Sequence, residues 1–427
     1  MAGKRQPAAS RWSNTPEYVE LKNDMLDDLD TRGLVGRQYT DKVQEYMNLW
    51  CWLKMLNEDV VTRGVYVEYS NGATQKGTTD NKSLTIATRV SAQMLNIWTA
   101  LGFRKQAVRM MSCKLPVEVS NYIEIVESNQ PRACKEQRSL VAHVRNCFET
   151  EELYVDTEQL NKYLGLIKYF PYDRLFPWEA FVLALWDCTY KADGMPRWKT
   201  LFCMVGRGAG KDGFIAFDSA CSVSPYNPVA HYNVDICANN EEQAVTPVKD
   251  LAEVLENPKF EAKLKKHYYH TKEIIQGRKN KGVMKGRTNN PKGRDGMRSG
   301  KVVFNEVHAF ENYDNIKVFI TGQGKVAQPR VGIFTSNGEI SDGPLDDYLA
   351  RGRRILFEGE PDNGFLPFIC CLENKEQVHD PENWYMANPS LYYLPHLRQE
   401  IEDEYRDWCE HPEQNGDFIT KRMGIRA

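Results

Sequence analysis

The residues from Gly206 to Lys211 combine types that commonly bind phosphate. An apolar run, Thr200 to Val205, stops at this glycine-rich segment, and apolar residues resume at helical spacing over 214–220. This order predicts a strand, a glycine loop and a helix. Glycines let backbone N–H groups approach a phosphate, and the positive end of the helix points at it. We expect Lys211 to reach the β- and γ-phosphates of a bound nucleotide.

The loop departs from the usual phosphate-loop pattern at two positions. The pattern G-x-x-x-x-G-K-[ST] has glycine where Val205 stands and a hydroxyl residue where Asp212 stands. A glycine-rich turn between a buried strand and a helix is therefore an alternative interpretation. If the loop does bind a nucleotide, the residues expected to contact it are Gly206, Arg207, Gly208, Ala209, Gly210, Lys211 and Asp212.

Two later apolar runs also end in polar residues. The run from Lys301 to Phe304 is followed by Asn305 and Glu306. Glu306 is the natural candidate for the carboxylate that activates water in ATP hydrolysis with Mg²⁺; the alternative is an exposed acid at the end of a strand. The run Arg330–Phe334 is followed by Thr335, Ser336 and Asn337. These three could sense the γ-phosphate and couple its loss to movement, or serve as ordinary turn residues.

Composition limits the classes of protein to which the chain can belong. A hydrophobic share of 41% and a charged share of 26% are ordinary for a globular chain that buries a core. The net charge of −3 gives no general affinity for nucleic acid. The eleven cysteines show no zinc-type spacing, which favours free thiols. No run approaches the ~18 apolar residues of a membrane span, so we expect no membrane partner.

Positive charge is concentrated in one stretch. Residues 263–301 hold thirteen Lys and Arg against two acids, Glu273 and Asp295. Such a stretch is either a solvated face or a surface that grips the phosphates of DNA. Arg298 and Arg294 precede Glu306 closely enough to be candidates for an arginine finger that reaches a neighbouring subunit.

The periodicity of apolar residues divides the chain into five parts. We expect a disordered arm at 1–15, a helical region at 16–105, a helical lead-in at 106–170 and an α/β core at 171–390. An acidic helix and a linker are expected at 391–427.

From about Val117 to Ala427 the chain resembles the ATPase part of phage large terminase subunits. The segments that carry this resemblance are 133–138, 175–181, 206–211, 240–244, 302–310, 334–338 and 386–391. The resemblance implies a P-loop NTPase core of mostly parallel strands flanked by helices. It also implies a homo-oligomeric ring on a portal protein that uses ATP and Mg²⁺ to drive double-stranded DNA into a procapsid, in the host cytoplasm. The first hundred residues resemble phage small terminase subunits.

Three positions depart from the large terminase pattern. The adenine-side glutamine is Glu179 here, the hydroxyl after the loop lysine is Asp212, and the aspartate before the catalytic glutamate is Asn305. The family uses the last two positions at the metal. One interpretation is a compensating swap in which Asp212 supplies the carboxylate that Mg²⁺ requires. The other is a degenerate site that hydrolyses ATP poorly.

The family pattern usually continues into a nuclease domain, and we expect none in this chain, since 420–427 lies about where that domain would begin. A separate chain could supply the nuclease or a small terminase subunit. Two other functions are alternatives. One is a DNA-recognition and assembly module with a vestigial ATPase site. The other, a helicase-like ATPase, would need a second motor domain, for which the residues after Leu391 are too few.

Overall fold

A computed structural model describes residues 9–13, 15–31, 33–71, 75–101, 115–288 and 298–426. The chain forms two compact units, Met1–Ser112 and Cys113–Ala427. The division therefore falls a few residues after the boundary expected at 105, and residues 113–170 of the helical lead-in belong to the second unit.

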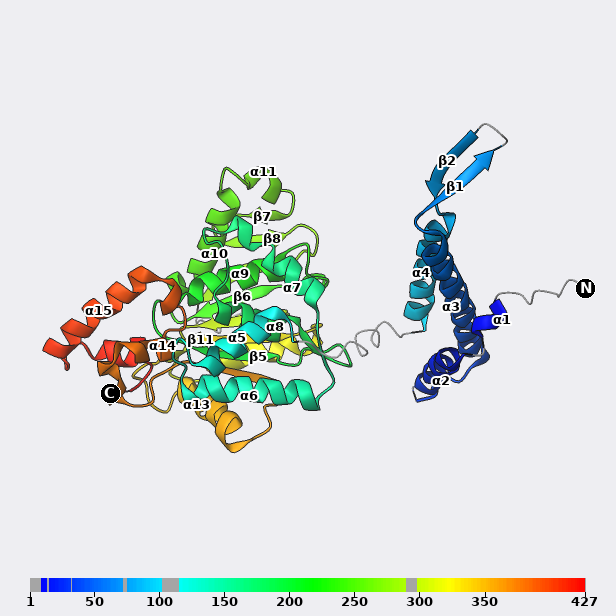
Figure 1. Ribbon diagram of the computed structural model, residues 1–427. Coiled ribbons are helices and arrows are strands. Elements are labelled where there is room, and N and C mark those ends of the chain that lie inside the picture. The colour runs from blue at the N-terminus through cyan, green and yellow to red at the C-terminus, as the bar shows by residue number, and fades with distance from the viewer. Residues whose placement is uncertain are drawn as a thin grey trace, which may run out of the picture. The chain divides into compact units, whose positions relative to one another are not determined.

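The first unit is helical with one hairpin, as the periodicity predicts. Figure 1 shows the hairpin projecting beyond one end of its two long helices. Apolar residues at three- and four-residue spacing, such as Val43 and Met47, form its core. Its elements are α1 (Ala9–Trp12), α2 (Pro16–Thr31), α3 (Arg37–Arg63), β1 (Tyr66–Asn71), β2 (Gln75–Asp80) and α4 (Lys82–Ala100).

The predicted disordered arm, 1–15, is helical at α1. The ring of Trp12 lies 6.2 Å from that of Trp50 on α3, edge to face, and this tertiary contact explains why a segment without helical periodicity is ordered. Residues 1–8 and 14 lie outside the described part of the chain.

The second unit is built on an eight-stranded sheet in the order β12-β5-β11-β10-β6-β9-β8-β7. The strands from β12 to β9 run parallel, and β8 and β7 are antiparallel. This confirms the predicted α/β core with a mostly parallel sheet. The strands of the unit are β3 (Leu153–Val155), β4 (Thr189–Lys191), β5 (Thr200–Met204), β6 (Val234–Ala238), β7 (Tyr268–His270), β8 (Ile274–Gly277), β9 (Val283–Thr288), β10 (Lys301–Asn305), β11 (Arg330–Thr335) and β12 (Phe365–Ile369).

Helices cover both faces of this sheet, which is why its central strands read as continuous apolar runs. On β5, Leu201 and Cys203 belong to the core on one face, and Phe202 and Met204 to the core on the other. The helices are α5 (Val117–Ser128), α6 (Lys135–Thr150), α7 (Thr157–Leu164), α8 (Pro177–Cys188), α9 (Lys211–Val223), α10 (Glu241–Glu256), α11 (Glu261–Leu264), α12 (Asp314–Thr321), α13 (Pro344–Arg353), α14 (Trp384–Ala387) and α15 (Pro395–Glu410).

The register aligns the carboxyl ends of the central strands. Phe304 on β10 lies beside Ile333 on β11, which lies beside Phe202 on β5. The loops after these three strands therefore meet at one edge of the sheet, where open α/β folds place their ligands.

The basic stretch 263–301 contributes strands β7, β8 and β9 to the sheet, which its charge pattern did not indicate. Lys301 is fully buried and Arg287 pairs with Asp235 at 2.8 Å, so these two cations are not part of an open basic surface. No helix in the described ranges is long and apolar enough to cross a membrane.

Candidate functional site

The loop between β5 and α9 carries unpaired backbone donors. Gly208 and Gly210 have φ of 81° and 100°, a left-handed conformation that glycine adopts without steric cost. Among the described residues, no hydrogen-bond acceptor faces the backbone N–H groups of Gly208, Gly210, Lys211 or Asp212. These donors stand at the N-terminus of a 13-residue helix, whose dipole also favours an anion. The arrangement suits a phosphate.

Residues near the C-terminus hold the other side of this loop. The N–H of Gly206 donates to the carbonyl of Ala387 at 2.8 Å, and that of Arg207 to the carbonyl of Lys421 at 2.8 Å. The guanidinium of the buried Arg422 donates to the Arg207 carbonyl at 2.6 Å. These bonds fix the loop's conformation, and they leave the backbone N–H groups of Gly208, Gly210, Lys211 and Asp212 available for a ligand.

Glu306 lies at the end of β10 and faces the loop lysine. Its backbone is left-handed, with φ 54° and ψ 51°, a strained conformation for a residue with a Cβ. One carboxylate oxygen is 3.8 Å from Lys211 Nζ, and the other is 2.9 Å from His308 Nδ1. Burial favours the protonated form, but His308 and Lys211 outweigh it and lower the pKa of Glu306 to about 2. The structure thus brings together the two residues predicted to act in catalysis.

Asp212 and Asn305 are in direct contact, as expected from strands that end at the same edge. Asn305 Nδ2 donates to Asp212 Oδ1 at 2.8 Å. The amide oxygen of Asn305 accepts from the N–H of Glu306 at 3.1 Å. Asn305 therefore turns an N–H, not an oxygen, toward Asp212, and the role of the two residues as metal ligands stays a prediction. In this arrangement Asp212 presents the carboxylate and Asn305 orients it.

The predicted coupling residues divide between two neighbourhoods. The Thr335 hydroxyl accepts from the backbone N–H of His308 at 3.0 Å and so touches the segment after Glu306. Asn337 donates to the carbonyl of Gly424 at 2.8 Å, toward the C-terminal segment. Thr335, Ser336 and Asn337 are all buried.

Glu179 is buried beside the glycine loop. A Cβ on Gly210 would lie 3.4 Å from one oxygen of Glu179, while the other oxygen accepts the N–H of Phe176 at 2.8 Å and caps α8. Burial raises the pKa of the Glu179 carboxyl to about 8. Because half of this side chain is used as a cap, its expected nucleotide contact is restricted to the oxygen that faces the loop.

Arg298, one of the two arginine-finger candidates, is not part of the site within this chain. Arg298 is exposed and precedes β10, whose five residues separate it from Glu306 by about 13 Å of strand. Arg294 lies outside the described residues. A role in a neighbouring subunit's site stays a prediction for both.

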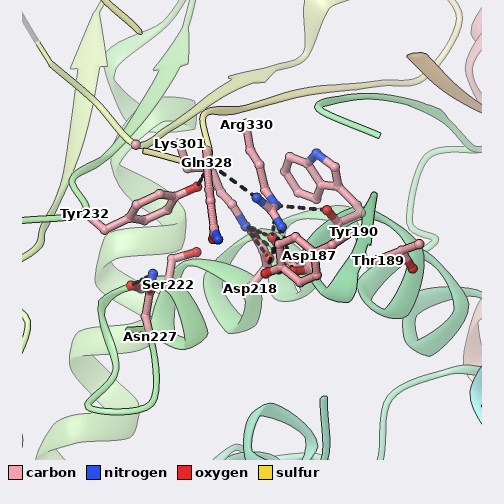
Figure 2. Close-up of polar contacts among 12 residues, drawn as sticks. Asp187, Thr189, Tyr190, Asp218, Ser222, Asn227, Tyr232, Lys301, Gln328 and Arg330 are labelled. Carbon is pink, nitrogen blue, oxygen red and sulfur yellow. Dashed lines mark hydrogen bonds and ion pairs between the residues drawn. The ribbon is translucent and has the colours of Figure 1, made fainter. Parts of the chain in front are cut away.

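A buried ion cluster lies on the same elements as the site, with Lys301 and Arg330 at the starts of β10 and β11, Asp187 near the end of α8 and Asp218 in the middle of α9. Lys301 Nζ is 2.8 Å from Asp187 and 2.7 Å from Asp218, and the Arg330 guanidinium lies 3.0 Å from Asp187. Figure 2 shows Lys301 and Arg330 converging on Asp187. Burial favours a neutral Lys301, but the two carboxylates outweigh it and raise the pKa of its amine above the ordinary range.

This cluster ties together α8, α9, β10 and β11. The site residues lie on or directly after the same four elements; they are Glu179, Lys211, Glu306 and Thr335. We therefore regard the cluster as the anchor that fixes the site residues relative to one another.

Among the residues that the structure describes, one other group of side chains has metal-ligand chemistry. His143, Cys147 and Asp362 bring three such atoms within 4.8 Å of one another. Arg197 donates to both oxygens of Asp362, at 2.8 and 2.9 Å, and lies 3.4 Å from Cys147 Sγ. The guanidinium already supplies the positive charge, so this group is an ion-pair network.

Sequence reasoning missed His308, Arg422 and Ser390 as parts of the site. His308 is close to Glu306 in the chain, and a titratable residue two positions after a strand-end acid was a signal that could have been used. The Ser390 hydroxyl donates to the carbonyl of Ala209 at 2.6 Å. It and Arg422 reach the loop from about 200 residues away in sequence, and no local pattern reports such a contact.

Comparison with known proteins agrees with this architecture. No protein-family model matches the chain. It is 26% identical over 238 residues to the terminase large subunits of Lactococcus phages p2 and SK1, covering 53% of this chain and 41% of each relative. The matched region is thus less than half the length of these relatives. The predicted resemblance to a large terminase subunit is confirmed.

A solved structure shares the fold. The large terminase of bacteriophage HK97 superposes with a TM-score of 0.52 and 18% sequence identity, over 64% of this chain and 56% of that one. At this level of identity the similarity concerns the fold alone, and it confirms the α/β architecture with a mostly parallel sheet.

Proposed function

We propose that this chain, which is similar to phage large terminase subunits, hydrolyses ATP to drive double-stranded DNA into a procapsid. The observation that carries the proposal is the meeting of Lys211, Asp212 and Glu306 beside the unpaired amides of the glycine loop. A cation, two carboxylates and a set of backbone donors at one strand edge are the parts that phosphoryl transfer to water requires.

The residues of the chain divide the work of hydrolysis. The loop amides and Lys211 bind and orient the β- and γ-phosphates, and Glu306 accepts a proton from the attacking water. The carboxylate of Asp212 fits Mg²⁺, a hard cation that takes oxygen ligands, and the ion would neutralise phosphate charge when bound. Asn305 holds Asp212 in place through its amide N–H.

ATP turnover by the purified chain, with and without DNA, tests this proposal. Lys211→Ala should weaken nucleotide binding, because it removes the cation at the phosphates. Glu306→Gln should bind ATP and turn it over slowly. The matched control is Glu311→Gln, the same change at an exposed acid in the segment after β10. Turnover at the parent rate by Glu306→Gln would refute the assignment of Glu306.

The partners proposed from the resemblance are DNA, a portal protein and further copies of the chain in a ring. Exposed cations in the described part of 263–301 support a DNA contact; they are Lys263, Lys265, Lys266, Lys272, Arg278, Lys279, Lys281 and Arg298. Mixed assemblies test the finger role: Arg298→Ala subunits should slow the parent subunits beside them. Unslowed parent subunits would exclude Arg298 as the finger.

A DNA-recognition and assembly module with a vestigial ATPase site is the second candidate. The observation in its favour is Asn305, which stands in the family's aspartate position and presents no oxygen to a metal beside Asp212. The two functions differ in one measurement: the module would bind DNA and assemble, with no ATP turnover above that of Glu306→Gln.

A further inference from the structure

We propose that His308 is a positioning residue that holds the Glu306 carboxylate in place and links it to Thr335 on the neighbouring strand. The inference rests on the proposed ATPase function and adds to it a residue outside the phosphate-binding loop. It assigns to His308 an effect on turnover, and none on nucleotide binding.

His308 lies between the two strand-end segments of the site. It belongs to the short helical turn η3 (Val307–Ala309), directly after Glu306, and its side chain is 18% exposed. Its Nδ1 is 2.9 Å from Glu306 Oε2 and 3.3 Å from Thr335 Oγ1. Its backbone N–H donates to the same Thr335 hydroxyl at 3.0 Å. Two contacts with Thr335 therefore fix His308 to β11. The same Nδ1 atom also approaches the carboxylate of Glu306.

The packing restricts the movement of the imidazole. A Cβ on Gly338 would lie only 2.6 Å from the Cβ of His308, so the absence of a side chain at Gly338 is what admits the histidine. The Thr335 hydroxyl donates to the carbonyl of Ser336 at 2.6 Å, which leaves its lone pairs for His308. A shift of the segment after β11 would thus move His308, and with it the partner of Glu306.

Glu306 depends on His308 most when a phosphate is bound. Its other carboxylate oxygen lies 3.8 Å from Lys211, which a bound phosphate would draw away. Oε2 is buried, and its approach to His308 is at hydrogen-bond distance without hydrogen-bond alignment, so a small rotation of either side chain completes the bond. Once Lys211 engages the nucleotide, His308 still lies at hydrogen-bond distance from the carboxylate, whereas the charge of Arg207 acts on it from beyond ion-pair distance.

Two substitutions at His308 separate a hydrogen-bonding role from a packing role. His308→Asn keeps an N–H donor near the place of Nδ1, and His308→Leu keeps the bulk without a donor. Loss of a hydrogen bond to a charged group corresponds to about ten- to one-hundredfold in rate. His308→Leu should lower kcat by that factor while the Kd for a fluorescent ATP analogue changes less than about twofold. His308→Asn should recover most of kcat.

The link to Thr335 is tested by a double-variant comparison. Thr335→Val removes the hydroxyl and keeps the shape, and it should lower kcat through His308. Its effect should therefore be much smaller in the His308→Leu background than in the parent. Equal effects of Thr335→Val in both backgrounds would overturn the link. The melting temperature of each variant shows whether the fold is retained, and if His308→Leu does not fold, His308→Asn with Thr335→Val supplies the comparison.

The outcomes distinguish this inference from the function on which it rests. A parent chain without ATP turnover overturns the proposed function and the inference with it. An active parent with unchanged kcat in His308→Leu overturns the inference alone. So does an equal loss in His308→Leu and His308→Asn, because the donor would then have no special part.

Discussion

Replacing Glu179 with glutamine should stabilise the larger unit by several kcal/mol at pH 8 and by less than about 1 kcal/mol at pH 5. Glu179 is 5% exposed, and burial raises the pKa of its carboxyl from an ordinary value of 4.5 to about 8. One pH unit between the two values is worth about 1.4 kcal/mol, so keeping this residue buried above pH 8 costs about 5 kcal/mol. Glutamine has the same shape, is neutral at every pH and can still accept the N–H of Phe176 that caps α8.

The sign of the effect follows from proton binding. Below pH 4.5 Glu179 is protonated in both folded and unfolded chains, and it makes no pH-dependent contribution. Between pH 4.5 and about 8 the unfolded chain loses this proton while the folded chain keeps it, so the free energy of unfolding falls as the pH rises. The loss is complete above about pH 8. The glutamine variant is free of this loss.

Urea unfolding of the full chain at pH 5 and pH 8, followed by tryptophan fluorescence, measures the difference. The smaller unit does not contain residue 179, so its transition is an internal reference. The control is Glu241→Gln, the same change at an exposed acid in the first turn of α10, and it should have little effect at either pH. If Glu179→Gln stabilises the larger unit equally at both pH values, or at neither, the folded chain does not hold Glu179 protonated.

Three further predictions concern the metal side of the site, the buried cluster and the basic surface. Asp212→Ser should lower ATP turnover, and adding Asn305→Asp should restore much of it, because the two side chains touch at 2.8 Å; strictly additive rate effects would contradict the compensating swap. Lys301→Met should destabilise the larger unit by about 3–5 kcal/mol in chemical denaturation, since it leaves the buried Asp218 without a cation and Asp187 with Arg330 alone, and a loss below about 1 kcal/mol would argue against ionised partners. Replacing the exposed Lys272 and Lys279 by glutamine should flatten the dependence of log DNA affinity on log salt by about 0.9 for each DNA phosphate that the variant no longer neutralises; an unchanged slope would remove both lysines from the DNA surface.

The sequence predicts those parts of the site that lie at strand ends. Lys211 and Glu306 could be placed because an apolar run that ends in polar residues locates the edge of a parallel sheet, and parallel strands share that edge. The contact of Asp212 with Asn305 follows from the same argument. The orientation of the Asn305 amide does not, because it is set by a backbone N–H one residue away.

Long-range contacts were beyond the reach of sequence reasoning. In the sequence, Lys301 is one of thirteen cations in a basic stretch. In the fold it is buried between Asp187 and Asp218, two residues that lie far from Lys301 along the chain. Strand β12 carries no polar residues at its end that would mark it, and its place beside β5 is known only from the fold. Patterns of charge and periodicity report local structure, whereas these features depend on which distant segment covers a side chain.

The state of Glu306 is the physical argument against a vestigial site. A carboxylate whose pKa is about 2 is a weak base, and in the resting chain Glu306 would serve water activation poorly. Its low pKa depends on positive neighbours, among them Lys211 at 3.8 Å. A phosphate in the loop would draw Lys211 away and add negative charge, and both changes raise the pKa of the glutamate. Nucleotide binding would thus strengthen the base at the moment it is needed. A site that had lost its function would have no reason to keep Glu306 in a strained left-handed conformation, facing the loop lysine and supported by His308.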